Sequence, residues 1–136
     1  MSSPRHRARE AALRALYLYE VGRTEPGLAL ETFFVEHEPD APAAVRDFAS
    51  QLVLGTVGDL VALDALITQH SQHWRIERLA VIDRMILRMA VWELRHAADT
   101  PAAVVLNEAV ELARTFGTDD SVRFVNGVLD GIRKSL

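Results

Sequence analysis

The spacing of the apolar residues constrains this chain more than any other feature, because it follows the 3.6-residue period of an α-helix almost from end to end. In the first segment the apolar residues fall at i, i+4, i+7, i+8 and i+11 (Ala8, Ala12, Ala15, Leu16 and Tyr19). No segment alternates between apolar and polar residues for long enough to require a β-sheet. The sequence therefore predicts an all-α fold of six or seven helices.

Caps and helix-breaking residues divide this pattern into elements. Ser3 and Pro4 predict the start of the first helix, and Gly22 predicts its end. The later helices are expected over about 28–37, 43–70, 76–95, 101–117 and 119–134. Within the long third helix, Gly55 and Gly58 weaken the helical conformation and predict a bend or a close crossing.

Length and composition describe a globular chain. A chain of 136 residues can bury about two-thirds of its unfolded surface, so we expect a single compact domain over residues 1–136. No stretch approaches the roughly 18 apolar residues of a membrane span, and the amino terminus lacks the apolar core of a secretory signal. We therefore expect a soluble, cytoplasmic protein without a membrane partner. The sequence contains no cysteine, which excludes thiolate nucleophiles and cysteine zinc sites.

The charges are divided unevenly along the sequence. The formal net charge is −4, yet four of the fifteen Lys and Arg residues lie within the first fourteen positions. The stretch from residue 24 to residue 74 has eight acidic residues and one basic residue, Arg46. Such asymmetry indicates a polyanionic partner at the basic end, although an ordinary solvated helix face is the alternative.

Motifs in both halves of the chain resemble a known family. The carboxy-terminal half contains, in order, IDRMILRMAVWEL (82–94), VVLNEAVELARTFG (104–117) and FVNGVLDGI (124–132). The amino-terminal half contains R-x-R-A-R-E-x-A-x-x-A-L-Y, which begins at Arg5. Together these segments resemble the signature segments of the NusB family of bacterial transcription antitermination factors. The resemblance implies a NusB-like helical fold that binds single-stranded boxA RNA of ribosomal operons together with the ribosomal protein NusE. It also implies indirect association with other Nus factors and RNA polymerase.

The resemblance also implies which residues bind RNA. The matching positions are Arg5, His6, Arg7, Arg9, Tyr17, Asp120 and Phe124. His6 departs from a position that is often basic in the family. Two of these residues have a structural alternative, since Phe124 is also a typical core residue and Asp120 a typical helix cap.

A second set of residues is implied for the NusE surface. Asp83 matches an acidic family position, and the adjacent segment contributes His70, Arg75 and Leu79. The alternative for Asp83 is an ordinary surface ion pair with Arg78 or Arg84.

No pattern in the sequence indicates catalysis, a cofactor or a metal. There is no glycine-rich phosphate loop and no Ser-His-Asp arrangement, so we expect no enzyme. His70 and His73 have a spacing that suits a metal, but no third ligand is evident nearby.

Two alternatives to the antitermination function remain open. One is a helical interaction module or homodimer without an RNA role. The other is a relative of the NusB-like domain of ribosomal RNA cytosine methyltransferases, whose catalytic domain has no counterpart in the sequence up to Leu136.

Overall fold

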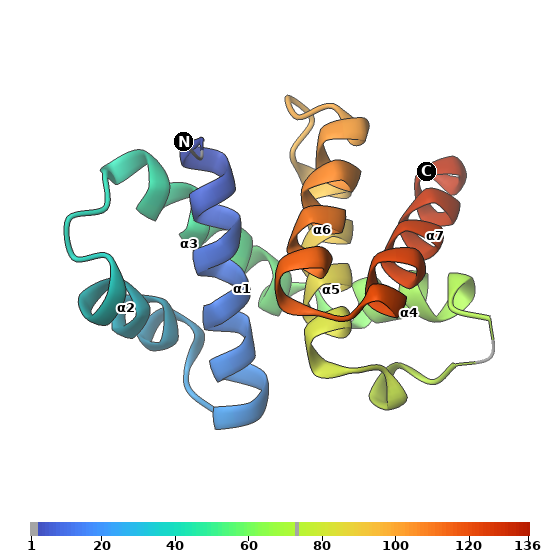
Figure 1. The fold of residues 1–136 in the computed structure, drawn as a ribbon, viewed down its shortest axis with the longest axis horizontal. Helices are drawn as coiled ribbons and strands as arrows, with labels where there is room; N and C mark the ends of the chain where they lie inside the picture. Colours follow the sequence, from blue (N-terminus) through green and yellow to red (C-terminus); the bar gives the residue numbers. More distant parts are fainter. Residues whose placement is uncertain (1–2, 73) are drawn as a thin grey trace. The chain divides into compact units, whose positions relative to one another are not determined.

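The computed structural model describes residues 3–72 and 74–136 and confirms the all-α prediction. The described residues form seven α-helices and one short 3-10 helix (Figure 1). They divide into two compact units, with the boundary between Gly58 and Asp59. The single domain expected over residues 1–136 stays a prediction. Among the described helices none is by itself long and apolar enough to cross a membrane, although the pair Ala43–Gly58 and Leu60–His70 taken together meets that criterion.

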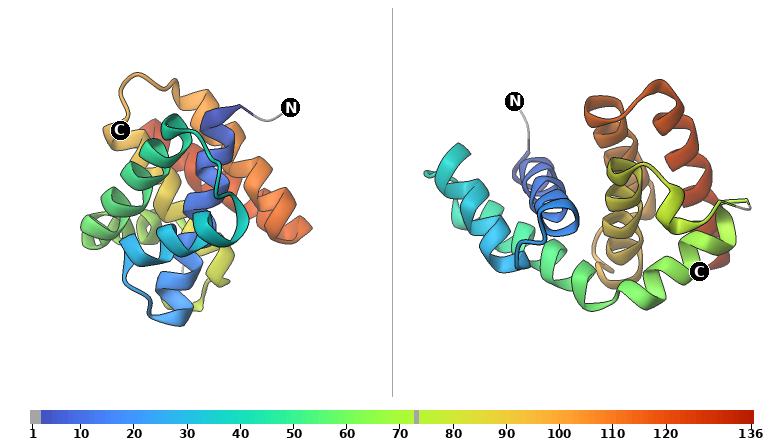
Figure 2. Two further views of the ribbon diagram at one scale, coloured as in Figure 1. Left: turned by 90° about the vertical axis from the view of Figure 1, so that its left-hand side faces the viewer. Right: turned by 90° about the horizontal axis from the view of Figure 1, so that it is seen from below.

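The amino-terminal unit consists of three helices, α1 (Pro4–Gly22), α2 (Pro26–His37) and α3 (Ala43–Gly58). Helix α1 packs against both α2 and α3, as Figure 2 shows. The face of α1 that the sequence predicted to be buried is buried except for Tyr19, which is only partly buried. Its buried side chains are mostly small (Ala8, Ala11, Ala12 and Ala15). Alanine side chains allow the neighbouring helices to approach closely, and Leu13 and Leu16 fill the space between them.

Local capping sets the ends of α1 and the start of α2. The Ser3 hydroxyl accepts a hydrogen bond from the His6 N–H at 3.1 Å, which confirms the predicted start of α1. Helix α2 begins at Pro26, two residues before the predicted start. The reason is Glu25, whose carboxylate accepts hydrogen bonds from the N–H groups of Gly27 at 3.1 Å and Leu28 at 2.9 Å. These bonds, the one from Leu28 being the stronger influence, lower the pKa of the Glu25 carboxyl group from its usual value.

The long third helix predicted over residues 43–70 is two helices, so that prediction is wrong. Helix α3 ends at Gly58, and α4 (Leu60–His70) begins after Asp59, whose φ of −132° and ψ of 25° are not helical. Gly58 is one of the two glycines, with Gly55, at which the sequence predicted a weakness. The break lets Leu63 and Ile67 of α4 become fully buried. A weak helix former at the junction makes this rearrangement inexpensive.

The carboxy-terminal unit is assembled around α5 (Val81–His96), which packs against α4, α6 (Ala102–Phe116) and α7 (Asp119–Ser135). The predicted start of this helix at residue 76 is wrong. Residues Ile76–Arg78 form one 3-10 turn, and Leu79 is extended before α5 begins. The Ile76 carbonyl accepts a hydrogen bond from the Leu79 N–H at 3.3 Å and a second one from Arg84 at 3.2 Å, which ties the turn to α5.

Two further contacts order this unit. Arg88 on α5 donates from Nε and Nη2 to both carboxylate oxygens of Asp64 on α4, at 2.7 and 2.8 Å. At the start of α7, Thr118 and Ser121 form a capping box. A Cβ atom on Gly117 would lie 2.6 Å from the Ser121 hydroxyl, so this close approach requires glycine.

Candidate nucleic-acid interface

The first turn of α1 carries positive charge where a helix does not favour it. Arg5 and Arg7 lie within this turn, and no acidic residue accompanies them there. The amino-terminal end of a helix carries a partial positive charge, so cations at this position destabilise the helix slightly. Helix formation therefore does not explain the arginines, and their role in binding RNA stays a prediction.

Two of the predicted RNA-binding arginines lie over one aromatic ring of α3. The Arg5 guanidinium is 4.0 Å from the centre of the Phe48 ring, and Arg5 is exposed. The Arg9 guanidinium is 5.4 Å from the same ring, but only 3% of Arg9 is exposed. Arg5 thus presents a charge at the surface, whereas Arg9 contributes to the packing of α1 on α3. Contact of Arg9 with RNA stays a prediction that its burial disfavours.

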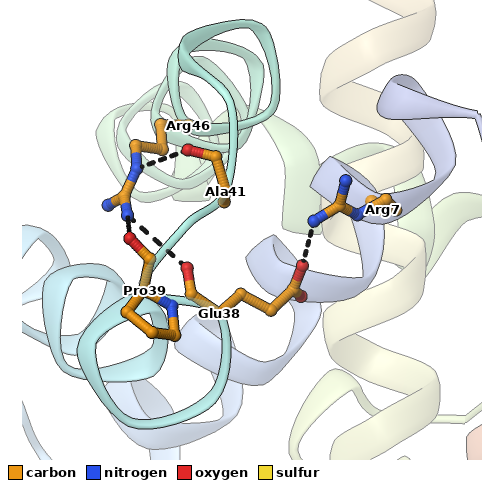
Figure 3. Close-up of polar contacts among 5 residues, drawn as sticks. All are labelled: Arg7, Glu38, Pro39, Ala41 and Arg46. Carbon is orange, nitrogen blue, oxygen red and sulfur yellow. Dashed lines mark hydrogen bonds and ion pairs between the residues drawn. The ribbon is translucent and has the colours of Figure 1, made fainter.

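The other two amino-terminal candidates have acidic neighbours. His6 Nε2 lies 2.6 Å from Glu10 Oε1, one turn further along α1. Arg7 Nη2 donates to Glu38 Oε1 at 2.6 Å, and Glu38 belongs to the connection between α2 and α3 (Figure 3). The sequence reasoning did not identify Glu38, because 31 residues separate it from Arg7. The charge of Arg7 is therefore partly neutralised, and His6 lies beside a carboxylate.

The connection that carries Glu38 is held by Arg46 of α3. Arg46 donates to the carbonyl oxygens of Ala41 at 3.0 Å, Pro39 at 2.7 Å and Glu38 at 3.5 Å (Figure 3). Its guanidinium also lies 4.7 Å from the centre of the Phe34 ring. A single arginine thus fixes the backbone around Glu38. Arg46, the one base in the acidic stretch, has a structural role.

Tyr17 is the aromatic candidate of α1, and 40% of it is exposed. It lies twelve residues after Arg5, which corresponds to about 18 Å along the helix axis. Leu18 and Val21 beside it are also exposed. An exposed aromatic ring is suitable for stacking on a base, and this role of Tyr17 stays a prediction.

In the carboxy-terminal unit, Asp120 lies at the surface of α7. It forms an exposed ion pair with Arg123, one turn away. The alternative interpretation of Asp120 as a helix cap is wrong, because the hydroxyl of Thr118 caps α7. Asp120 and Arg123 together therefore place opposite charges side by side on this face.

Phe124 lies in the wall of a surface hollow. It is half-buried, so it both packs against the unit and offers part of its ring to the surface, and its interpretation as a core residue stays an alternative. The hollow has a volume of about 260 Å³. Its lining comes from the end of α4, the segment after it, and α7 (His70, Ser71, Gln72, Trp74, Arg123, Phe124, Gly127 and Val128). Two aromatic rings and one arginine in a hollow are groups that bind an unstacked base.

The predicted NusE residues occupy different environments. His70 lines the same hollow, and its Nδ1 lies 3.0 Å from the Leu66 carbonyl oxygen. Arg75 is exposed and lines a neighbouring depression with Trp74 and Arg78. Leu79 is only 8% exposed, so its side chain supports the segment more than it offers a contact.

Asp83 is half-buried in the first turn of α5. Its Oδ1 is shielded from solvent and has no hydrogen-bond partner in the described part of the chain. The alternative of an ion pair with Arg78 or Arg84 is therefore not observed there. A shielded carboxylate oxygen without a donor is costly, so this position is unfavourable for the stability of the unit.

The structure brings some of the predicted site residues together within each unit. His70 and Phe124 share one hollow, which joins the candidate partner surface to the candidate RNA surface within the carboxy-terminal unit. The five α1 candidates belong to the amino-terminal unit. Trp74 and Arg123 were missed by the sequence reasoning. A tryptophan next to the polar run HSQH was the available signal, since an aromatic residue outside the helical period is often a surface contact.

In the described parts of the chain, residues 3–72 and 74–136, no metal site accompanies these surfaces. Among the described residues, no three His, Cys, Asp or Glu side chains lie close enough to hold an ion. His73 of the HSQH pair lies outside the described residues.

Comparison with known proteins supports the resemblance. The model of the NusB family matches residues 6–134. A transcription antitermination protein NusB from Desulforamulus reducens is 45% identical over 125 residues, which cover 92% of this chain and 86% of that protein.

Solved structures of the family have the same fold. NusB of T. maritima matches with a TM-score of 0.90 and 35% identity, over 98% of this chain and 93% of that chain. A chain in the crystal structure of antitermination factors NusB and NusE in complex with dsRNA matches with a TM-score of 0.90 and 27% identity, over the full length of both chains.

Proposed function

Because the chain belongs to the NusB family, we propose that it is a transcription antitermination factor that binds boxA RNA of ribosomal operons together with NusE. In this role it joins other Nus factors on elongating RNA polymerase, in the cytoplasm, and acts by binding and not by catalysis. The observation that carries the proposal is the match of the family model across residues 6–134, which includes every candidate RNA-binding residue except Arg5.

We assign the RNA to two groups of residues. At the amino-terminal end of α1, Arg5 and Arg7 bind backbone phosphates, since an arginine fork suits phosphate geometry. In the hollow of the carboxy-terminal unit, Phe124 stacks on a base and Arg123 binds a neighbouring phosphate. Phosphate contacts position the RNA, while the base in the hollow supplies sequence information.

The accessible aromatic rings favour a single strand over a duplex. Tyr17 and Phe124 can stack only on bases whose faces are open, and duplex bases are stacked on one another. The similar structure with NusB and NusE contains double-stranded RNA. A direct comparison of the two RNA forms is therefore part of the test.

We assign NusE to the segment that contains His70, Arg75 and Leu79, together with Asp83. The match of Asp83 to an acidic family position supports this choice, because a basic ribosomal protein supplies cationic donors to a carboxylate. Leu79 then acts by holding the segment in place, while Arg75 and Trp74 provide exposed contacts.

An electrophoretic mobility shift with three RNAs tests the proposal. The RNAs are single-stranded boxA, a scrambled strand of the same composition and a boxA duplex, each with and without NusE. We expect the boxA strand to bind most tightly, with NusE increasing its affinity. Equal binding to the boxA and scrambled strands under every condition would refute sequence-specific antitermination for this protein.

A further inference from the structure

We infer that Glu38 attenuates RNA binding by occupying Arg7, and that Arg46 keeps Glu38 in place to do so. The inference rests on the proposed function, because it assigns a second role to a residue beside the RNA surface. Glu38 matches none of the family motifs quoted above, and it is identified only by its position in the fold.

The contact itself leaves Arg7 accessible but occupied. Arg7 Nη2 lies 2.6 Å from Glu38 Oε1, and the two side chains are 37% and 28% exposed. A pair with this exposure is open to a phosphate group approaching from solvent. The arriving phosphate finds the guanidinium already bound to a carboxylate (Figure 3).

The negative charge of Glu38 opposes the binding of a phosphate group to Arg7. A phosphate on Arg7 places its negative charge within a few ångströms of the Glu38 carboxylate, well inside the Debye length of about 8 Å. Either the guanidinium leaves Glu38, or the two anions share it and repel one another. Both outcomes reduce the net gain from the phosphate contact.

Glu38 has little freedom to withdraw. Its N–H donates to the Phe34 carbonyl at 3.0 Å, and its own carbonyl accepts from the Ala41 N–H at 3.1 Å. Arg46 binds the carbonyl oxygens of Glu38, Pro39 and Ala41 and so holds the same turn from α3. With the backbone fixed from both sides, only rotations of the Glu38 side chain separate the carboxylate from Arg7.

The consequence is a weaker sequence-independent contribution to RNA binding. Phosphate contacts are made with any RNA and carry no sequence information. A carboxylate that offsets one of them lowers affinity for all single strands alike. The base contact at Phe124 then accounts for a larger share of the binding free energy, which limits retention on unrelated RNA.

The test compares Glu38→Gln with Glu36→Gln in the full chain. Both substitutions remove one negative charge from neighbouring positions, but Glu36 is exposed and lies 4.0 Å from His37 instead of pairing with an arginine. Affinities for the boxA and scrambled strands are measured by fluorescence anisotropy at several salt concentrations. We expect Glu38→Gln to raise the affinity for both strands by about two- to fivefold, and Glu36→Gln to raise it less. The salt dependence should steepen by about 0.7 in the log–log slope for Glu38→Gln alone.

The second part of the experiment repeats both glutamate substitutions in an Arg7→Ala background. In that background Glu38→Gln should have no more effect than Glu36→Gln, because the residue that Glu38 occupies is gone. Thermal unfolding of each variant confirms that the fold persists.

The possible results distinguish a failure of the role inferred for Glu38 from a failure of the proposed function. If wild type binds the boxA strand but Glu38→Gln equals Glu36→Gln or weakens binding, the role of Glu38 is refuted and the proposed function stands. If wild type binds neither strand, with or without NusE, the proposed function fails, and the role of Glu38 fails with it.

Discussion

At the scale of single residues, burial distinguishes arginines that look alike in the sequence. Arg5, Arg7 and Arg9 occur at every second position of one motif. In the structure Arg5 is exposed over Phe48, Arg7 is paired with Glu38, and Arg9 is almost fully buried. One basic motif therefore supplies a surface charge, a paired charge and a packing residue.

The difference in burial between Arg9 and Arg5 predicts that one alanine substitution lowers stability and the other weakens RNA binding. Arg9→Ala should lower the free energy of unfolding by about 1 to 3 kcal/mol, because it removes buried side-chain contacts and a guanidinium near the Phe48 ring. Arg5→Ala should change stability by less than about 0.5 kcal/mol and instead weaken RNA binding. Urea unfolding and RNA titration of both variants measure the two effects. A stable Arg9→Ala variant with weakened RNA binding would restore Arg9 to the RNA surface.

A second residue-scale prediction concerns Phe124. Phe124→Ala should weaken binding of the boxA strand by about 1 to 3 kcal/mol, the usual cost of losing a base–aromatic stack. Phe124→Tyr retains the ring and serves as the matched variant, with affinity near that of wild type. Anisotropy titrations measure both. If the two substitutions weaken binding equally, stacking is not the role of Phe124.

At the scale of elements, periodicity alone misplaces the ends of helices, whereas capping side chains locate them. The helix predicted over 43–70 breaks at Asp59, and the helix predicted from 76 begins at Val81. In contrast, α7 begins within the predicted range because Thr118 and Ser121 form a capping box. A helix start is predictable where the capping side chains are adjacent in the sequence.

The cap of α2 predicts a dependence on pH. Hydrogen bonds from Leu28 and Gly27 lower the pKa of Glu25 in the folded protein, so the ionised form is favoured more in the folded than in the unfolded chain. This contribution to stability is fully present above the unfolded pKa of about 4.3 and is lost as the pH falls through the lower, folded value. The free energy of unfolding of Glu25→Gln should therefore lie below that of wild type at pH 7, and the difference should shrink as the pH falls below about 4.

Urea unfolding at pH 7, 5 and 3 measures this difference. Glu31→Gln, which changes an exposed acid of the same helix, is the matched control. A gap between Glu25→Gln and wild type that stays constant across this range would show that the charge of Glu25 does not stabilise α2.

At the scale of the whole molecule, the proposed function requires one protein to bind a polyanion and a basic protein. Two aspartates of the carboxy-terminal unit represent these two tasks. Asp120 is exposed on α7 near the hollow with Phe124, and Asp83 is half-buried on α5 with a shielded oxygen. The sign of the charge then decides what each substitution does.

Asp120→Asn should maintain or raise the affinity for boxA RNA, because it removes a negative charge beside the strand. Asp83→Asn should weaken NusE binding and leave the binding of isolated RNA nearly unchanged. Titration of both variants against RNA alone and NusE alone measures the four affinities. Loss of RNA affinity in Asp83→Asn with NusE binding intact would reverse the placement of the two surfaces.

The sequence by itself determined the helical class, because the 3.6-residue period is a property of neighbouring residues. It also determined the family, through motifs of nine to fourteen residues, and it pointed to Phe124 and Asp83 as candidates beyond the basic helix. These signals are local, or are shared with relatives, and can be interpreted without knowing which helices pack together.

Only the tertiary structure decided which arginines are buried, which are paired with a carboxylate and which are exposed. Glu38 is 31 residues from Arg7, and Phe48 lies on a different helix from Arg5 and Arg9. Whether an arginine is buried, paired or exposed depends on residues far along the chain, and the periodicity of its own helix contains no information about them. For the same reason the hollow that joins His70 to Phe124 became visible only when α4 and α7 were packed against one another.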